Sequence, residues 1–305
     1  MAKSKIEWTD EVWNPITGCT KVSQGCEHCY AETIANRFWA TQYPPNEDGS
    51  PRKFTNVRLH PERLEDLLKW RKPRRVFVNS MSDLFHEDVP DEFIAAVWGR
   101  MIAAPQHTFM ILTKRPIRMT EIVPNLYRDL FTNEPQVVPN VWLGVSVEDQ
   151  ATADERIPYL LQTPSAVRFV SYEPALGPVD FNYWLTERYG CGGERANAGC
   201  EECWWQLNKL DWIIMGGESG PGTRPMHPDW ALSMRDQCQA AGVPFFFKQW
   251  GGYCCFEQLP EDGKGLKDTQ YEPIDVGGCT VYRVGKKAAG RILDGRTWDE
   301  FPEVM

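Results

Sequence analysis

Six short apolar runs recur between residues 75 and 250, and helix-length amphipathic stretches separate them. Each run is too short for a helix and is rich in β-branched or aromatic residues, which is typical of buried parallel strands. A strand–helix unit repeated this often predicts a parallel α/β fold. The six runs are 76–78, 108–112, 141–145, 167–170, 212–215 and 244–247.

The stretches between the runs carry helix signals. The stretch 91–98 begins with two acidic residues, which favour a helix N-terminus. The stretch 149–161 has apolar residues three and four positions apart, and 229–241 is followed by Gly242, a typical C-cap. The fold class that we predict is α/β, a partial (β/α) barrel of about six to seven parallel strands.

Two segments fall outside this rhythm. Residues 177–210 are rich in glycine and cysteine, and we interpret them as an insertion on the barrel rim. Residues 251–305 hold only weaker strand signals, such as 280–284. We therefore expect a barrel domain over 1–250 that includes the insertion, and a small C-terminal appendage over 251–305.

Polar or charged residues follow every predicted strand. In a (β/α) barrel, and in an open parallel sheet, the active site is built at these strand ends. Glu148, Glu173 and Glu218 each come within a few residues of a buried strand. These positions favour a shared polar site, with ordinary loop chemistry as the alternative.

Charge and hydropathy exclude several classes of protein. The chain has 33 Lys and Arg against 42 Asp and Glu, a net charge of −9, so it lacks the basic excess of proteins that coat duplex nucleic acid. Its one dense basic run, between Lys69 and Arg75, is interpreted as a solvated helix end. No apolar run reaches the roughly 18 residues of a membrane span, and the N-terminus lacks a signal peptide. We expect a cytoplasmic protein without a membrane partner.

Ten cysteines in such a chain indicate metal ligands or reactive thiols rather than disulfides. Cys19, Cys26 and Cys29 lie within eleven residues. Structural zinc sites use four protein ligands, whereas an iron–sulfur cubane held by three thiolates keeps one iron open for another molecule. The spacing favours an iron–sulfur cluster, and zinc or unligated thiols remain as alternatives.

A second trio, Cys191, Cys200 and Cys203, lies in the insertion. It is a possible second metal site, with three interpretations open: zinc completed by a distant cysteine, an auxiliary iron–sulfur cluster, or no metal. Cys254, Cys255 and Cys279 are the candidates for the distant ligand in the zinc case. Cys238 is expected to pack as a small apolar residue on its helix.

The segment Cys26-x-x-Cys29-Tyr30-Ala31, followed by a helical stretch and repeated strand–helix units, resembles the radical S-adenosylmethionine (SAM) enzymes. More narrowly, the chain resembles the phage-borne three-cysteine-motif family of that superfamily. The gap between Cys19 and Cys26 is six residues, against three in the usual motif of the superfamily. The further matching stretches are 13–19, 171–174, 216–222, 246–251 and 287–291.

The resemblance implies a 4Fe–4S cluster on Cys19, Cys26 and Cys29, with SAM bound at the open iron. The superfamily's Gly-Gly-Glu motif, which contacts the SAM amino group, normally follows the second strand, whereas Gly216-Gly217-Glu218 follows a late strand here. The candidates for the SAM amine and carboxylate are therefore the polar residues after the early strand 76–78. Glu148 is a candidate for a ribose hydroxyl, with surface exposure as its alternative. The early candidates are Asn79, Ser80, Ser82 and Asp83.

The resemblance further implies that reductive cleavage of SAM yields a 5′-deoxyadenosyl radical, which abstracts hydrogen from a substrate inside a barrel that excludes water. Arg115, Glu173 and Lys248 are the predicted catalytic residues, with Arg115 and Lys248 as partners for a carboxylate or phosphate. The expected reaction rearranges an aminoacyl (glycyl) thymidine in phage DNA from the N-linked to the C-linked form. The expected electron donor is a flavodoxin or ferredoxin, and the expected place is the host cytoplasm if the chain is phage-encoded.

Two other functions remain open. One is a radical SAM repair activity on damaged DNA, resembling spore photoproduct lyase. The other is a zinc-stabilised nucleic-acid-binding protein without catalysis, which zinc in place of iron and sulfide would indicate.

Overall fold

The computed structural model describes residues 6–43, 45–46, 48–128, 133–186, 208–255 and 273–303. By its internal contacts the chain divides into two compact units. Unit 1 comprises Met1–Val145 with Thr163–Ala166, and unit 2 comprises Ser146–Gln162 with Val167–Met305. The expected division into 1–250 and 251–305 is a different one and stays a prediction.

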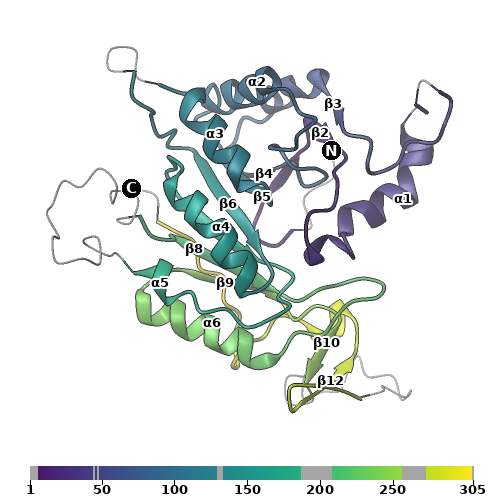
Figure 1. Cartoon of the computed structure of the whole chain (residues 1–305), viewed down its shortest axis with the longest axis vertical. Coiled ribbons are helices and arrows are strands. Elements are labelled where there is room, and N and C mark those ends of the chain that lie inside the picture. The colour runs from purple at the N-terminus through teal and green to yellow at the C-terminus, as the bar shows by residue number, and fades with distance from the viewer. Residues whose placement is uncertain are drawn as a thin grey trace, which may run out of the picture. The chain divides into compact units, whose positions relative to one another are not determined.

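The main sheet has seven strands in the described part of the chain, in the order β1-β4-β5-β6-β7-β8-β9. Its strands β4, β5 and β6 lie side by side in Figure 1. The pairings within each unit are parallel, β1 with β4, β4 with β5 and β5 with β6 in one, β7 with β8 and β8 with β9 in the other. This confirms the α/β class and the parallel sheet of a partial (β/α) barrel. All six predicted apolar runs became strands, and β1 was not foreseen.

Unit 1 holds the first strands of this sheet, and its strand interiors are buried as the apolar runs predicted. The helix α2 places Ile94, Val97, Trp98 and Met101 on its buried face, at the three- and four-residue spacing of an amphipathic helix. Burying one such side chain contributes about 1.5–3 kcal/mol. The helices α2 and α3 lie side by side. The elements are β1 (Glu11–Trp13), β4 (Arg75–Val78), α2 (Asp91–Ile102), β5 (Thr108–Thr113), α3 (Pro116–Leu126) and β6 (Val141–Val147).

A second group of elements in unit 1 surrounds the first three cysteines. β2 and β3 form a short antiparallel pair, and the cysteine loop runs from the end of β2 to the start of α1. The basic run begins where η2 ends, and Lys69 pairs with Asp66 there on the surface. The elements are β2 (Ile16–Thr17), η1 (Gln24–Cys26), α1 (Tyr30–Gln42), β3 (Arg58–Leu59) and η2 (Pro61–Lys69).

Unit 2 continues the strand–helix alternation. The strand β8 is buried along its whole length, and α6 ends at Gly242, whose φ of 64° is the left-handed C-cap that the sequence predicted. Cys238 is fully buried on α6, which confirms its packing role. The helices α5 and α6 lie against each other. The elements are α4 (Gln150–Gln162), β7 (Arg168–Tyr172), α5 (Asn182–Leu185), β8 (Trp212–Gly216), α6 (Pro228–Ala241) and β9 (Phe245–Gln249).

The C-terminal part of unit 2 forms a separate small sheet in the order β10-β12-β11, with antiparallel pairings. Its strand β12 confirms the weak strand signal at 280–284. A short helix, α7, follows. The elements are β10 (Tyr253–Cys255), β11 (Pro273–Val276), β12 (Cys279–Arg283) and α7 (Lys286–Ala289).

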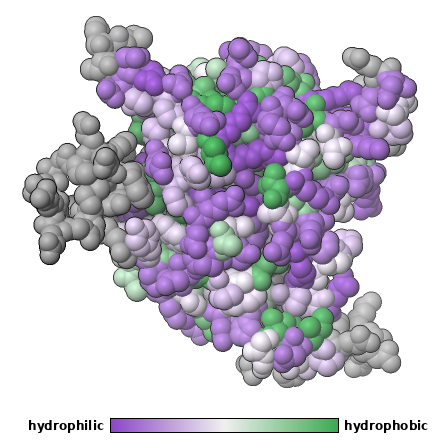
Figure 2. All heavy atoms as spheres, in the orientation of Figure 1, coloured by the Kyte–Doolittle hydropathy of each residue, from purple (hydrophilic) through white to green (hydrophobic). Residues whose placement is uncertain are grey.

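The face drawn in Figure 2 is largely hydrophilic, and hydrophobic residues appear on it as small separate patches. Scattered apolar residues of this kind are normal on a soluble surface and do not by themselves mark a docking site. Among the described residues, no helix combines the length and the apolar character that crossing a membrane requires.

Candidate functional site

The three N-terminal cysteines lie in one loop region of unit 1. Cys19 follows β2, Cys26 is the last residue of η1, and Cys29 directly precedes α1. All three are half-buried free thiols. Cys19 and Cys29 pack against the same small apolar cluster, whose members are Ala31, Ala35, Trp39 and Phe54. Cys26 lies between these two along the chain, so one loop region carries all three thiols.

Gly18 fixes the backbone that carries Cys19. Its φ is 98°, and a Cβ at this position would collide with the carbonyl groups of Asn56 and Phe54. Its N–H donates to the Met81 carbonyl at 3.0 Å, and the Cys19 N–H donates to the Phe54 carbonyl at 2.9 Å. Only glycine meets both the dihedral and the space requirement at this position.

Burial favours the protonated form of Cys19 and Cys29. Burial, aided by the Asp83 carboxylate and opposed by Arg115, raises the pKa of Cys19 to about 12. Burial is also the main cause that raises the pKa of Cys29. A metal that binds here must displace thiol protons, as metals do at cysteine sites.

The donor set of this loop fits an iron–sulfur cluster. Thiolates are the ligands of such clusters, and three of them leave one iron of a cubane without a protein ligand. In the described part of the chain, no three Cys, His, Asp or Glu side chains are already grouped tightly enough to hold a metal ion.

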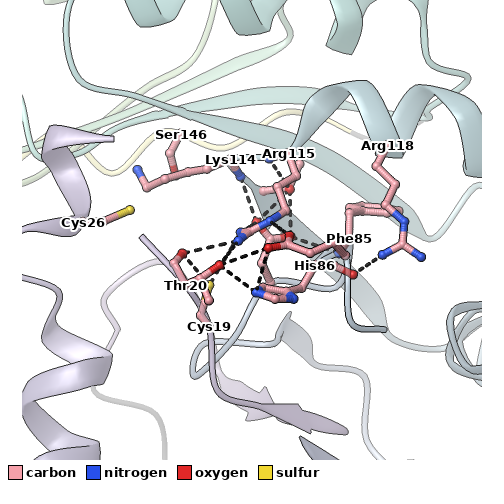
Figure 3. A network of polar contacts seen from close by, with 12 residues as sticks. Cys19, Thr20, Cys26, Phe85, His86, Lys114, Arg115, Arg118 and Ser146 are labelled. Carbon is pink, nitrogen blue, oxygen red and sulfur yellow. Dashed lines mark hydrogen bonds and ion pairs between the residues drawn. The ribbon is translucent and has the colours of Figure 1, made fainter. Parts of the chain in front are cut away.

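The Arg115 guanidinium contacts two residues of the cysteine loop, Cys19 and Thr20 (Figure 3). Arg115 lies directly before α3, and its Nη1 donates to the Cys19 sulfur at 3.6 Å. The Nη2 atom donates to the Thr20 hydroxyl at 2.8 Å and to the Thr20 carbonyl at 3.3 Å. The Nε atom donates to Glu87 at 2.8 Å, and Nη1 also pairs with Asp83 at 3.4 Å. All three guanidinium nitrogens thus have partners within unit 1.

Asp83 is the buried anchor of this arrangement. Its carboxylate accepts hydrogen bonds from the Phe85 and Lys114 backbone N–H groups at 3.0 and 3.1 Å. It also accepts from the Thr113 hydroxyl at 2.8 Å, besides the Arg115 contact. Because the loop after β4 and the end of β5 both bind this carboxylate, Asp83 fixes the position of Arg115.

Thr20 and His86 complete the network. The Asp88 N–H donates to His86 Nδ1 at 3.1 Å, so the proton of the neutral ring sits on Nε2, which lies 2.8 Å from the Thr20 hydroxyl. Burial, with Arg115 second, lowers the pKa of His86 and favours this neutral form. The Thr20 hydroxyl donates in turn to Glu87 at 3.3 Å.

The candidate SAM ligands after β4 fold back on the segment before Cys19. The Ser82 hydroxyl donates to the Ile16 carbonyl at 2.9 Å, and Ser80 donates to the Asn14 amide oxygen at 3.3 Å. Asn79 has a φ of 62°, and its side-chain oxygen accepts from the Ile16 N–H at 3.4 Å. Its amide nitrogen is buried without a hydrogen-bond partner. This amide nitrogen is the member of the set best placed to donate a hydrogen bond to a ligand's carboxylate, since an unmet buried donor is costly.

In unit 2, two predicted catalytic residues come together. Lys248 on β9 pairs with Glu173, which follows β7, at 3.0 Å. The Ser171 hydroxyl also donates to Glu173, at 3.1 Å. Gly216, at the end of β8, leaves room for the pair, because a Cβ there would lie 2.6 Å from the Glu173 carboxylate.

The other two glutamates of unit 2 form separate ion pairs. Glu218 accepts from the Arg224 backbone N–H at 2.8 Å and from its guanidinium at 2.7 and 3.1 Å. Glu148 is fully buried and pairs with Arg156 at 3.0 Å. The surface-exposed alternative for Glu148 is therefore wrong, and its contact with a ribose stays a prediction.

The second cysteine trio, Cys191, Cys200 and Cys203, lies outside the described residues. Of the thiols suggested to complete it, Cys255 and Cys279 pack in the small apolar cluster of the C-terminal sheet. Burial raises the pKa of Cys254 to about 12. A metal site at this trio stays a prediction.

Residues 3–302 match the model of one protein family, described as "Protein of unknown function (DUF5131)". The chain belongs to this family. No curated protein gives a match. Among solved structures, the chain is similar to spore photoproduct lyase complexed with dinucleoside spore photoproduct, at 10% sequence identity and a TM-score of 0.39. That similarity covers 89% of this chain and 67% of the other.

Within the described part of this DUF5131 chain, the predicted site residues form two groups, one in each unit. Unit 1 brings together the three cysteines, the residues after β4 and Arg115, and unit 2 brings together Glu173 and Lys248. Sequence reasoning missed Thr20, His86 and Glu87, which bind Arg115 or one another. Thr20 is adjacent to a predicted ligand, and His86 follows the predicted SAM loop by three residues, so position along the chain was the available signal.

Proposed function

We propose that this DUF5131 protein is a radical SAM enzyme whose Cys19, Cys26 and Cys29 hold a 4Fe–4S cluster. The observation that carries the proposal is the cysteine loop itself: three free thiols in one neighbourhood, beside a basic side chain at the ends of parallel strands. The resemblance of the cysteine motif to radical SAM enzymes supports the same assignment. The three thiols supply the protein ligands, and the remaining iron is open to SAM.

When bound and reduced, the cluster and SAM supply a 5′-deoxyadenosyl radical for hydrogen abstraction. In unit 1, the buried amide nitrogen of Asn79 would hold the SAM carboxylate, and Ser80 and Ser82 fix the loop that carries Asn79. Asp83 supports this loop, because its carboxylate accepts hydrogen bonds from backbone N–H groups, Thr113 and Arg115.

In unit 2, we propose that the Glu173–Lys248 pair contacts the substrate and that Glu148 serves a ribose. Lys248 is partly exposed while held by Glu173, so it can offer a positive charge to a substrate carboxylate or phosphate. The buried Glu148–Arg156 pair ties α4 to the end of β6, since Arg156 also donates to the Ser146 carbonyl at 2.8 Å.

The substrate class that we propose is a modified thymidine in DNA, with glycyl-thymidine converted from the N-linked to the C-linked form. Hydrogen abstraction from the amino acid's α-carbon starts the rearrangement. The bond between the amino nitrogen and the thymine methylene carbon breaks, a bond between the α-carbon and that methylene carbon forms, and one hydrogen returns to the nitrogen, so substrate and product are isomers. A flavodoxin or ferredoxin supplies the electron. The support for this substrate is the resemblance of the chain to the phage-borne three-cysteine-motif family.

Two assays on the anaerobically reconstituted protein test the proposal. With SAM and a reductant, the wild type is expected to form 5′-deoxyadenosine, and Cys19→Ala, Cys26→Ala and Cys29→Ala are expected to form none. Cys279→Ser is the matched control, because Cys279 is a half-buried thiol in the C-terminal sheet. Absence of 5′-deoxyadenosine from a wild type that holds iron and sulfide contradicts the enzyme class.

The second assay concerns the substrate. DNA that carries N-linked glycyl-thymidine is incubated with the active protein, digested and separated as nucleosides. An isomerisation changes the retention of the nucleoside and keeps its mass. Unchanged retention contradicts the isomerase, and loss of thymine photoproducts from irradiated DNA in a parallel reaction indicates repair instead.

A further inference from the structure

We infer that Arg115 is a positioning residue that tunes the reduction potential of the cluster through its hydrogen bond to the Cys19 sulfur. This inference rests on the proposed function, because it concerns a cluster bound by Cys19. It goes beyond that function by naming what makes the cluster reducible in this chain.

The Arg115 side chain is held rigidly by its contacts. Its three nitrogens contact Cys19, Thr20, Asp83 and Glu87, and its side chain is about one-tenth exposed. A guanidinium has a fixed planar fork, so contacts at every nitrogen define its orientation. Arg115 is thereby pre-organised toward the sulfur.

The loop after β4 supports both Arg115 and Cys19. Asp83 is held by the Lys114 backbone N–H and the Thr113 hydroxyl, both at the end of β5. Gly18 pairs with Ser82 in an isolated parallel bridge, which ties the backbone before Cys19 to the same loop after β4. The sulfur and the guanidinium are therefore both positioned by the loop of Asp83, and movement of a single side chain does not separate them.

The effect of Arg115 on the reduction potential of the cluster is electrostatic. Reduction adds negative charge to a cluster and its thiolates, and a nearby positive charge or hydrogen bond to a ligating sulfur stabilises the reduced state. Arg115 supplies both to Cys19. The carboxylates of Asp83 and Glu87 oppose this effect, and His86 is kept neutral by burial. The net effect of these charges on the reduction potential therefore depends on the balance between Arg115 and its two carboxylates. Removing the positive charge lowers the potential, and removing a carboxylate raises it.

Two substitutions of opposite sign test the inference by redox titration of the reconstituted cluster, followed by electron paramagnetic resonance. Arg115→Gln removes the positive charge and is expected to shift the midpoint potential negative. A shift of about 59 mV corresponds to a tenfold change in the one-electron equilibrium. Glu87→Gln removes an opposing negative charge from a mostly exposed side chain and is expected to shift the potential positive. Arg115→Lys keeps the charge and is expected to fall between wild type and Arg115→Gln.

Arg118→Gln is the matched control. Arg118 lies in the first turn of α3, the helix that Arg115 precedes. It binds the His86 and Val89 carbonyls and the Asp91 carboxylate, and no hydrogen bond joins it to Cys19. It is expected to leave the potential within error of wild type. If Arg115→Gln does not fold or hold iron, the positive shift of Glu87→Gln still tests the inference, because Glu87 is on the surface.

The outcomes separate this inference from the proposed function. Failure of the wild type to bind iron and sulfide contradicts the proposed function. A wild type that binds the cluster and cleaves SAM, with unchanged potentials in Glu87→Gln and Arg115→Gln, overturns the inference alone. Equal negative shifts in Arg115→Gln and Arg118→Gln also overturn it, because they indicate a general loosening of α3.

Discussion

The Nη1 atom of Arg115 lies 3.6 Å from the Cys19 sulfur, although 96 positions separate the two residues in the sequence. One residue follows β2 and the other precedes α3, so the contact joins two segments of unit 1 that are far apart in the sequence (Figure 3). The cysteine loop is thus not an isolated metal-binding segment. It is bound into the strand ends through a buried carboxylate, Asp83.

Gly18→Ala is expected to destabilise the protein and to impair cluster retention. A Cβ at this position meets the Asn56 carbonyl, and the φ of 98° disfavours any side chain. We expect a loss of about 1–2 kcal/mol for the dihedral and a further 1–3 kcal/mol for the collision. Denaturant unfolding measures the free energy, and Gly49→Ala is the control, because Gly49 has a φ of 78° with open space around it. Equal losses in the two variants would show that the collision with Asn56 does not matter.

Glu148→Gln is expected to destabilise unit 2, because it leaves Arg156 buried opposite a neutral group. Breaking a buried ion pair at one partner costs about 3–5 kcal/mol. The control is Glu155→Gln, whose carboxylate is mostly exposed and 3.9 Å from the same arginine, and which is expected to stay near wild type. Replacing both Glu148 and Arg156 by Met is expected to cost less than Glu148→Gln alone, and a larger loss would argue against this account.

Acid is expected to destabilise the protein partly through His107. This side chain is buried next to Trp70 and Phe109, and burial lowers its pKa from 6.5. A lowered pKa in the folded state means that the unfolded state binds the proton first, so this contribution to stability is present above 6.5 and is lost as the pH falls below it. His107→Phe is therefore expected to lose less stability than wild type between about pH 8 and about pH 5. The measurement is the free energy of unfolding across that range, and parallel pH profiles would refute the assignment.

The parallel α/β fold could be predicted because its signals are local. Each buried strand carries its own apolar run, and the left-handed Gly242 marks the end of α6 within the sequence itself. The strand β1 escaped prediction because it is three residues long and lies in a segment with polar neighbours on both sides. It is a strand because it pairs with β4, whose residues come more than sixty positions later.

In the candidate site, too, residues with a local sequence signal could be predicted and their distant partners could not. The cysteine trio stands out by its spacing, and Glu173, Glu148 and Lys248 stand out at strand ends. The partners of these residues do not, because Arg115 meets Cys19 and Lys248 meets Glu173 only through sheet topology. Arg156 is nearer in sequence to Glu148, yet its pairing requires the first turns of α4 to fold against the end of β6.

The iron and sulfide content of the anaerobically reconstituted protein tests the central claim most directly. We predict that Cys19→Ala, Cys26→Ala and Cys29→Ala each lose about four iron and four sulfide per chain relative to wild type, as expected for one cubane. Cys279→Ser is predicted to match wild type. Wild-type protein that takes up zinc without sulfide, or alanine variants that keep the full iron content, would contradict the assignment of these three thiols to a cluster.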